Sequence, residues 1–309
     1  MPYKRISLII PAFNEFPNIS DIGKRARALF PDCEIILVDD GSTDSTARIV
    51  KHSDFRIIHH PLNIGNGAAV KSGIRAASGE TVIFMDGDGQ HDPVDIPTLL
   101  EHMDKYDMVV GARTSDQQAS LPRRFMNRIF NRLASYITSF QILDLTSGFR
   151  ALRAVTAREM LPLLPNGYSW PTTTTMVALR SGLSVKYVPI NVRPRQHGRS
   201  RIRPMRDSTR IFLIIMKICT LYSPLRIFLP VSGGIFLLGL INYGHTYFTS
   251  GRFTNMSAVM FIAAVIIFLM GLISEQISQI NMLRLHINPR DSKAELKESE
   301  YKNTNASEN

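Results

Sequence analysis

The sequence has few of the features that mark a secreted or disulfide-bonded protein. Its 309 residues include two cysteines, Cys33 and Cys219, which lie far apart and without the close spacing of metal ligands. We therefore expect neither a disulfide nor a cysteine metal site, which favours a reducing compartment. The start of the chain, MPYKRISLIIPAFNE, holds too short an apolar run for a signal peptide, and no small-residue cleavage site follows it.

The sequence is also poor in acidic residues, with 26 Asp and Glu against 36 Lys and Arg and a formal net charge of +10. Much of the excess lies in one arginine cluster, defined as Arg193, Arg195, Arg199, Arg201, Arg203, Arg206 and Arg210. Such a cluster suits anionic lipid, phosphate or nucleic acid. It adjoins apolar segments rather than an aromatic-rich sheet face, which argues against nucleic acid as the partner.

Two stretches, residues 227–248 and 256–274, contain no Asp, Glu, Lys or Arg. Each is close to the ~20 residues that a helix needs to cross a bilayer. We predict a transmembrane hairpin over residues 225–287, with a loop at 245–255; a buried hairpin in a soluble protein is the alternative. Because Arg226, Arg284 and the arginine cluster flank the open end, both termini are expected in the cytoplasm and the loop outside.

The segments on either side of the hairpin differ from it in composition. Residues 205–224 predict an amphipathic helix with an apolar stripe formed by Ile211, Ile214, Ile215, Ile218 and Tyr222. Such a helix suits a membrane surface or packing on the preceding domain, and its pattern leaves both open. Residues 288–309 are charged and predicted to be disordered.

Residues 1–204 alternate short β-branched runs with helical patterns, and we expect them to form one catalytic domain. The predicted strands are residues 6–10, 34–38, 55–59, 82–85, 108–110 and 185–192. Helices are expected from residue 18 or 20 to 29, and at 65–77, 92–105 and 121–139. This alternation predicts an α/β fold with a mostly parallel sheet, in which ligands bind beyond the carboxyl ends of the strands.

The strongest chemical signal is TVIFMDGDGQHDP at residues 81–93. Asp86 and Asp88 follow an apolar run and, in an extended segment, share one face. Together with Gln90 they offer hard oxygen ligands for a divalent cation that also binds phosphate oxygens. A polar turn after a buried strand is the alternative. His91 is either a further ligand or a structural histidine.

Five motifs in order, PAFNE, VDDGSTDST, NIGNGAAVKSG, DGDGQHDP and TSGFRA, make residues 5–205 resemble family 2 glycosyltransferases of the dolichol-phosphate mannose synthase type. The resemblance implies a GT-A-type nucleotide-sugar-binding domain. It also implies inverting transfer of a hexosyl or N-acetylhexosaminyl group from a UDP- or GDP-linked sugar to a polyprenyl or dolichyl phosphate. The expected cofactor is Mg²⁺ or Mn²⁺, and the expected location is the cytoplasmic face of a cell or ER-type membrane. The sequence leaves a homo-oligomer open.

The resemblance implies roles for individual residues. The metal and diphosphate motif corresponds to Asp86, Gly87, Asp88 and Gln90. The nucleotide pocket corresponds to Pro11, Phe13, Glu15, Val38 and Asp40, although Glu15 is equally suited to capping the next helix. Phosphate-binding positions correspond to Arg113, Arg128, Arg195 and Ser200. Catalytic roles are expected for Asp88, Arg128 and Asp144, the last of which precedes TSGFRA near the reaction centre.

The sequence departs from the family pattern in two places. Both residues that follow the metal-motif aspartates are glycine, and residues 167–176 lack the carboxylate that some relatives carry. A phosphomonoester acceptor, with a second pKa of about 6, needs no general base, because it is already mostly a dianion at neutral pH. A glycan or glycolipid acceptor would need such a base. A non-catalytic nucleotide-sugar-binding membrane protein is the third hypothesis.

Overall fold

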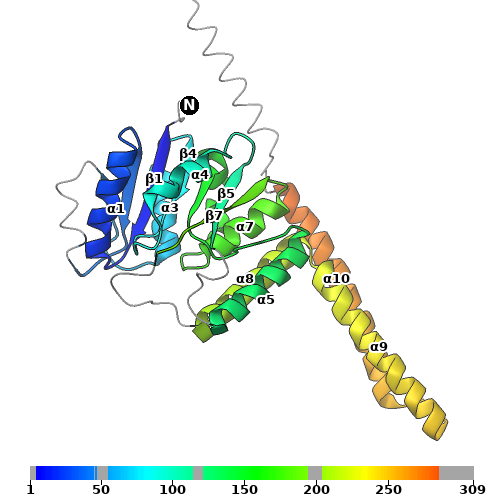
Figure 1. Ribbon diagram of the computed structural model, residues 1–309. Coiled ribbons are helices and arrows are strands. Elements are labelled where there is room, and N and C mark those ends of the chain that lie inside the picture. Colours follow the sequence, from blue (N-terminus) through cyan, green and yellow to red (C-terminus); the bar gives the residue numbers. More distant parts are fainter. Residues whose placement is uncertain (1–4, 45, 47–54, 114–120, 194–203, 285–309) are drawn as a thin grey trace, which may run out of the picture. The chain divides into compact units, whose positions relative to one another are not determined.

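The computed structural model describes residues 5–44, 46, 55–113, 121–193 and 204–284 (Figure 1). A seven-stranded sheet has the order β3-β2-β1-β4-β6-β5-β7. Its strands are β1 (Ile6–Ala12), β2 (Glu34–Asp39), β3 (Arg56–His59), β4 (Thr81–Phe84), β5 (Met108–Arg113), β6 (Arg150–Arg153) and β7 (Val185–Ile190). Of these strands β6 alone is antiparallel to its neighbours. The predicted α/β fold with a mostly parallel sheet is confirmed.

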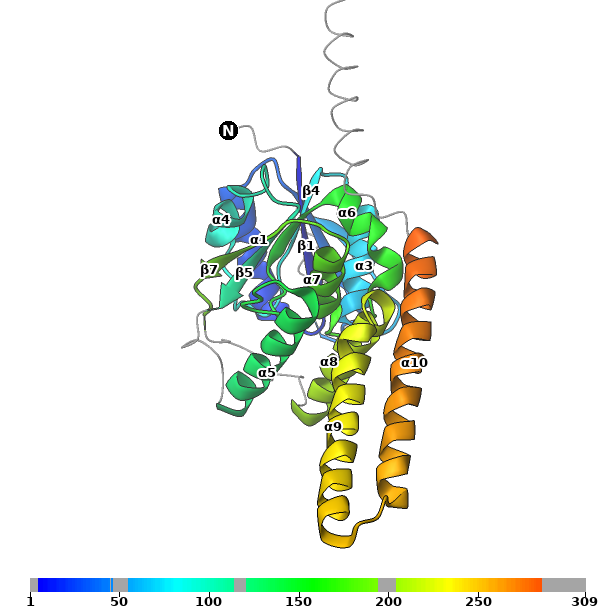
Figure 2. The ribbon, with the colours of Figure 1, turned by 90° about the vertical axis from the view of Figure 1, so that its right-hand side faces the viewer.

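Helices cover both faces of the sheet (Figure 2). One face carries α1 (Phe16–Leu29), a 3₁₀ turn (Pro93–Asp95) and α4 (Ile96–Leu100). The other carries α3 (Asn66–Ala76), α6 (Ala154–Glu159), a 3₁₀ turn (Leu161–Leu163) and α7 (Trp170–Arg180), with α5 (Leu121–Thr138) packed on α7. Leu8 and Ile9 point to opposite faces and both are buried. This two-sided burial explains why the strands are continuous apolar runs.

The antiparallel strand β6 places the segment before it beside the ends of the other strands. Arg150, at the start of β6, pairs with Phe84 at the end of β4 and with Val110 near the end of β5. The amino end of an antiparallel strand lies where its neighbours have their carboxyl ends. The TSGF segment therefore lies at the same edge of the sheet as the loops after β1, β2 and β4.

Two predicted helix boundaries were wrong. Helix α1 begins at Phe16, with Glu15 in the N-cap position, because Pro17 suits the first turn of a helix. The helix predicted at 92–105 is regular only over Ile96–Leu100. Pro97 cannot donate a hydrogen bond to the carbonyl of residue 93, and residues 101–105 form turns instead.

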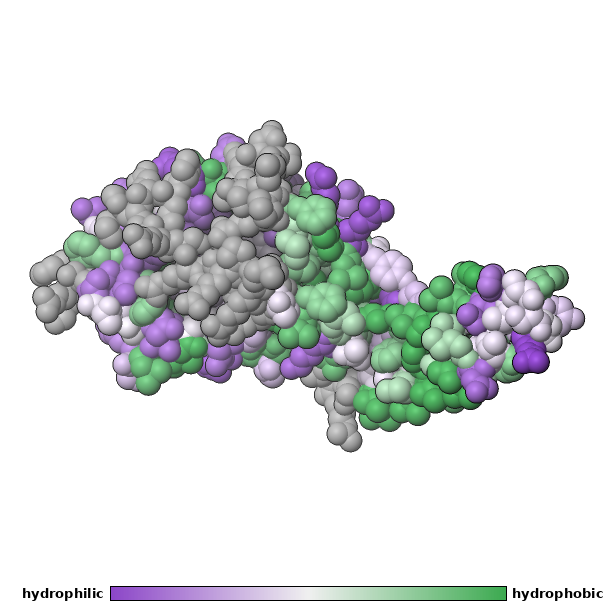
Figure 3. Space-filling model, turned by 90° about the horizontal axis from the view of Figure 1, so that it is seen from below, coloured by the Kyte–Doolittle hydropathy of each residue, from purple (hydrophilic) through white to green (hydrophobic). Residues whose placement is uncertain are grey.

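The chain divides into two compact units, one that contains the sheet and extends to Ile214, and one that spans Ile215–His286. Helix α8 (Pro204–Tyr222) leads from the first into the second, where α9 (Leu225–Ser250) and α10 (Asn255–Arg284) pack together. Both α9 and α10 are long and apolar enough to cross a membrane. Their outer surface is largely apolar, as the green residues in Figure 3 show. The predicted pair of apolar helices is confirmed.

The hairpin differs from the prediction at both ends. Residues 245–250, expected in the loop, are helical, and Gly251 ends α9 with a φ of 63° and a hydrogen bond from its N–H to the Tyr247 carbonyl of 2.9 Å. Helix α10 continues beyond Glu275, whose carboxylate accepts a hydrogen bond of 3.3 Å from the N–H of Leu225. This hydrogen bond compensates in part for placing the Glu275 carboxylate within an apolar helix. The tail predicted to be disordered lies outside the described residues.

Candidate functional site

The centre of the candidate site is the turn that follows β4. Asp86 lies against the Ser147–Gly148 turn so closely that a Cβ atom at position 148 would be 2.6 Å from its Oδ2 atom. The Asp86 side chain is 35% exposed, so the carboxylate remains accessible from one side. The N–H of Gln90 donates to Asp88 Oδ1 over 3.1 Å, which fixes the second carboxylate. The turn thus presents two ordered carboxylates at the sheet edge.

The loops after β1 and β2 are joined to each other by Asn14, which adopts a φ of 56°. Its Oδ1 atom accepts a hydrogen bond of 2.8 Å from the N–H of Thr43, and its own N–H donates to Ser42 Oγ over 2.9 Å. Pro11 and Val38 lie opposite each other in the register of β1 and β2, and both are buried. The predicted nucleotide-binding segments therefore lie side by side.

Asp40 and Glu15, which the resemblance assigns to the nucleotide pocket, also have structural partners. Asp40 is 2% exposed, and its carboxylate accepts hydrogen bonds from the N–H groups of Ile64 (3.0 Å) and Gly65 (2.8 Å) and contacts His60 Nδ1 at 2.8 Å. Glu15 Oε2 accepts from the side-chain amide of Asn18 over 3.0 Å, and it caps no backbone N–H of α1. Phe13 is half-buried. Their contacts with a nucleotide remain predictions.

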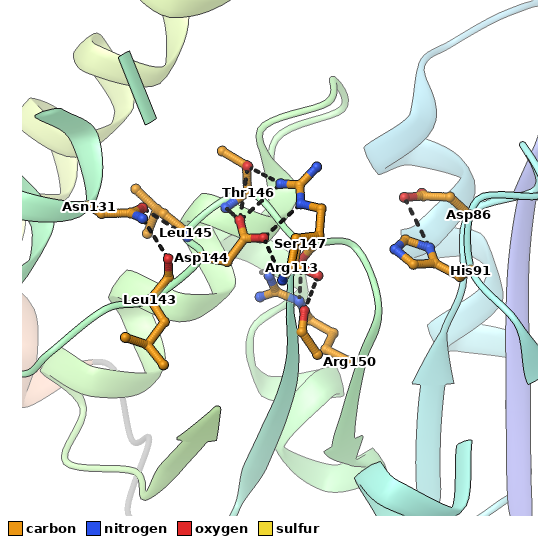
Figure 4. Close-up of polar contacts among 11 residues, drawn as sticks. Asp86, His91, Arg113, Asn131, Leu143, Asp144, Leu145, Thr146, Ser147 and Arg150 are labelled. Carbon is orange, nitrogen blue, oxygen red and sulfur yellow. Dashed lines mark hydrogen bonds and ion pairs between the residues drawn. The ribbon is translucent and has the colours of Figure 1, made fainter. Parts of the chain in front are cut away.

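Arg113 and Asp144 form a two-point ion pair at this edge (Figure 4). Arg113 Nε donates to Asp144 Oδ2 over 2.7 Å and an Nη atom donates to Oδ1 over 2.9 Å. Burial opposes the charged form of Asp144, but the charge and hydrogen bonds of Arg113 outweigh it and hold the pKa of Asp144 below its usual value. Asp86 and Asp88 lie near enough that their charges help to raise the pKa of Arg113.

Asn131 of α5 holds the segment that carries Asp144 (Figure 4). Its Nδ2 donates to the Leu143 carbonyl over 2.7 Å, and its Oδ1 accepts from the N–H of Leu145 over 3.1 Å. Asp144 itself is 2% exposed. A buried carboxylate with a lowered pKa is a poor proton acceptor, so this geometry suits a residue that positions Arg113.

The other predicted phosphate-binding residues are Arg128, Arg195 and Ser200, and their role stays a prediction. Arg128 is exposed on α5. Arg195 and Ser200 lie outside the described residues. The described part of the arginine cluster does reach the site, because the N–H of Arg193 donates to the Gln90 carbonyl over 2.9 Å.

His91 lies near Asp86 but beyond hydrogen-bond distance from it. Its Nδ1 atom is 4.0 Å from Asp86 Oδ2, and its ring stacks on Phe149 with centroids 5.2 Å apart. Burial lowers the pKa of His91 to about 4, so the ring is neutral at physiological pH. Within the described ranges no three His, Cys, Asp or Glu side chains are grouped as metal ligands. These contacts favour the structural interpretation of His91.

Sequence reasoning missed Arg150, whose side chain is fully buried. For the threonines at 172–175 it offered only a helix start or a contact with the sugar, whereas the hydroxyl oxygens of Thr174 and Thr175 accept hydrogen bonds from Arg150 of 2.6 Å and 3.1 Å. The arginine in TSGFRA and the run of threonines were visible in the sequence. Their 24-residue separation hid the contact.

A pocket of ≈ 480 Å³ lies apart from the two carboxylates. It is formed by the loop after β3, the loop before α7 and one residue of α8: Asn63, Ile64, Gly65, Pro165, Asn166, Gly167, Tyr168, Ser169 and Ile214. Neither Asp86 nor Asp88 lines it. Asp86 and Asp88 thus lie at the sheet edge outside this pocket, where a bound cation and its ligand could complete the site.

Comparison with solved structures identifies the fold class. Glucosyl-3-phosphoglycerate synthase from Mycobacterium tuberculosis is similar, with a TM-score of 0.56 and 23% identity over 70% of this chain and 80% of that chain. The same enzyme in complex with Mn²⁺, UDP and glucosyl-3-phosphoglycerate gives a TM-score of 0.55. This likeness confirms the predicted GT-A-type fold.

Sequence comparison identifies the family. Residues 7–161 match the model of glycosyl transferase family 2, and residues 223–280 match the GtrB C-terminal hairpin. An undecaprenyl-phosphate 4-deoxy-4-formamido-L-arabinose transferase of Pseudomonas savastanoi pv. phaseolicola is 30% identical over 78% of this chain and 72% of its own length. A Pseudomonas aeruginosa enzyme of the same description is 27% identical over 90% of this chain and 86% of its own length. The chain belongs to glycosyl transferase family 2, and its apolar hairpin supports membrane association.

Proposed function

We propose that this protein transfers one sugar from a nucleotide-diphosphate sugar to a polyprenyl phosphate at the cytoplasmic face of a membrane, with inversion at the anomeric carbon. The observation that carries the proposal is that Asp86 and Asp88, just after β4, and Arg113, the last residue of β5, lie at the same edge of the sheet. Carboxylates can bind a divalent cation that also binds the donor diphosphate, and a guanidinium pairs well with a phosphate group. The Pseudomonas relatives, named as undecaprenyl-phosphate sugar transferases, support this acceptor class.

The residues present fit a divalent cation, either Mg²⁺ or Mn²⁺. Asp86 is accessible, and Gly148 leaves room beside its carboxylate that any larger residue would fill. Asp86 and Asp88, with Gln90, would hold the ion, whose other ligands would be donor phosphate oxygens and water. The bound ion would stabilise the charge of the departing nucleoside diphosphate. The M. tuberculosis enzyme in complex with Mn²⁺ and UDP supports this proposal by analogy of fold.

The chemistry with a phosphate acceptor needs no proton acceptor on the protein. An acceptor phosphate oxygen forms the bond to the anomeric carbon while the bond to the donor diphosphate breaks, and no proton has to be transferred because the attacking oxygen is already ionised. A reaction without a general base agrees with two features of the chain. The Asp144 carboxylate is paired with Arg113, and residues 167–176 contain no carboxylate. Arg113 would hold one of the phosphates, and Arg128, Arg195 and Ser200 remain proposed phosphate ligands. Bringing two anions together is then the main task.

The proposed domain organisation is a catalytic domain (1–204), an interface helix (205–224), a transmembrane hairpin (225–287) and a tail (288–309). Helix α5 supports a membrane-facing domain, because it exposes Phe125 (64%), Ile129 (41%) and Tyr136 (58%) on one helical stripe next to the exposed Arg128 and Arg132. Apolar side chains flanked by arginines suit an anionic lipid surface. We place both termini in the cytoplasm and the hairpin loop outside.

This topology predicts which introduced cysteines are labelled in intact cells. A cysteine replacing the exposed Arg252 in the hairpin loop should react with a membrane-impermeant maleimide, whereas one replacing the exposed Asp104 should react only after permeabilisation. The native background should be low, because Cys33 and Cys219 are buried and burial raises the pKa of the Cys33 thiol to about 11. The opposite pattern of labelling would contradict the topology.

The activity is tested by incubating membranes that contain the protein with labelled nucleotide sugars, a polyprenyl phosphate and Mg²⁺ or Mn²⁺. The panel should include UDP- and GDP-linked hexoses, N-acetylhexosamines and a pentose, since the named relatives act on an arabinose derivative. We expect label in the organic phase, in a product that mild acid cleaves because a glycosyl phosphate is acid-labile. An acid-stable product would indicate a glycan or glycolipid acceptor. Nucleotide binding without transfer to any acceptor would indicate a non-catalytic protein.

A further inference from the structure

Arg150 carries a positive charge inside the core of the catalytic domain. It is the first residue of β6 and is 0% exposed. Within the described residues no carboxylate forms an ion pair with it; its hydrogen bonds go to carbonyl and hydroxyl oxygens. A buried cation without a paired carboxylate is costly, and an apolar side chain would stabilise a core better. Core packing alone therefore gives no reason for an arginine here.

The first target of Arg150 is the turn that abuts Asp86. Arg150 Nε donates to the Ser147 carbonyl over 3.1 Å, and an Nη atom donates to the same oxygen. The Ser147 side chain is also held, because its hydroxyl donates to the Gly111 carbonyl over 2.5 Å. The next residue, Gly148, is the one whose Cα lies against the Asp86 carboxylate. The guanidinium thus fixes the wall on one side of Asp86.

The second target of Arg150 is the start of α7, which packs on the end of β4. The Arg150 guanidinium carbon is 5.3 Å from the Trp170 ring centroid, and its other Nη atom donates to the Pro171 carbonyl over 2.9 Å. Trp170 packs on Phe84 with ring centroids 5.1 Å apart. Phe84 is the last residue of β4, two positions before Asp86. Arg150 therefore supports Asp86 through the strand end as well as through the turn.

We propose that Arg150 is a positioning residue that holds Asp86 in the geometry required for the divalent cation and the donor diphosphate. This inference rests on the proposed function. A planar guanidinium reaches Ser147, Pro171 and the threonine hydroxyls at fixed angles, which the single ammonium of lysine cannot do. Burial lowers the pKa of Arg150 to about 10, so the group remains a cation at neutral pH.

The test measures Mn²⁺ binding by the full-length protein in detergent, in the presence of UDP or GDP, from the electron paramagnetic resonance signal of free Mn²⁺. The variants are Arg150→Lys and Gly148→Ala. The first removes the guanidinium that binds the Ser147 carbonyl, and the second adds a methyl group on the side of Gly148 that faces Asp86. We expect each to weaken Mn²⁺ binding by about tenfold or more, as loss of a supporting contact to a metal ligand commonly does. The half-saturating Mn²⁺ concentration for transfer should rise equally, while the rate at saturating Mn²⁺ recovers to near the wild-type value.

The matched control is Arg153→Lys, at the other end of β6, where Arg153 lies 3.6 Å from Asp107. It should leave Mn²⁺ binding unchanged. A merely structural role for Arg150 would lower the folded fraction and the maximal rate without shifting the Mn²⁺ half-saturation; that result, or wild-type binding by Arg150→Lys, overturns the inference. If Arg150→Lys does not fold, Thr174→Val, which removes a hydroxyl that accepts a hydrogen bond from Arg150, decides by the same criterion. Absence of Mn²⁺ binding by the wild-type protein with either nucleotide would instead overturn the proposed function, and this inference with it.

Discussion

Replacing Asp88 by Asn should reduce sugar transfer to polyprenyl phosphate by roughly 10²–10³-fold or more, a loss comparable to that of other groups that stabilise developing charge. The variant keeps the shape of the side chain, and the introduced amide oxygen can still accept the hydrogen bond that the Gln90 N–H now gives to Asp88 Oδ1. What the variant loses is the negative charge that helps to hold the divalent cation. The measurement is label recovered in the organic phase at saturating donor and acceptor.

The control for this variant is Asp104→Asn, an exposed carboxylate in the turns after α4. It removes the same charge from the same domain and should leave the transfer rate within about twofold, since exposed substitutions away from special features have small effects. Both variants should remain in the membrane fraction and unfold at the wild-type temperature. Normal transfer by Asp88→Asn would remove the basis of the proposed metal site.

Replacing Asp144 by Ala should destabilise the domain by about 3–5 kcal/mol, the usual cost of leaving one partner of a buried ion pair alone. Asp144 is 2% exposed and accepts hydrogen bonds from Arg113 Nε (2.7 Å) and Nη (2.9 Å). Activity should fall as well, because Arg113 would lose the partner that orients it. The measurement is thermal unfolding of the full chain in detergent, together with the transfer assay.

The matched control is Asp21→Ala, which removes an exposed carboxylate 3.6 Å from Arg25. An exposed pair of this kind contributes about 0–1 kcal/mol, so its loss should be barely measurable. Asp144→Asn, which keeps hydrogen-bond acceptors on the side chain and loses the charge, should lie between the two. Equal unfolding temperatures for Asp144→Ala and Asp21→Ala would contradict the proposed importance of the buried pair.

The pH dependence of the Asp144 effect follows from its lowered pKa. The unfolded carboxyl titrates near its ordinary value of 3.8 and the folded one below that. The pair therefore stabilises the protein fully above pH ~4, and this stabilisation is lost as the pH falls through the folded pKa. The difference in stability between wild type and Asp144→Ala should be largest at pH 7 and should shrink below pH ~4. A constant difference over this range would show that the charge of Asp144 contributes little.

Local sequence was sufficient for the parts of the molecule that depend on neighbouring residues. The apolar runs predicted the six parallel strands, and the uncharged stretches predicted α9 and α10. Local sequence was not sufficient for two helix boundaries. Pro97 shortened the helix predicted at 92–105, and a distant contact with Leu225 accommodates Glu275 inside α10. Side-chain periodicity and turn chemistry act over a few residues, so such boundaries are the least determined.

The sequence by itself determined that Asp86 and Asp88 would follow a buried strand, because a short apolar run is a local property. The shared face predicted for them assumed an extended backbone, whereas β4 ends at Phe84 and Asp88 lies in the turn after it. The tertiary structure alone decided that β6 enters the sheet antiparallel between β4 and β5. That insertion brings Asp144 to Arg113, 31 positions away, and places Arg150 where Thr174 can accept from it. Which charges meet depends on strand order and burial, and these are set by the packing of the whole domain rather than by any short segment.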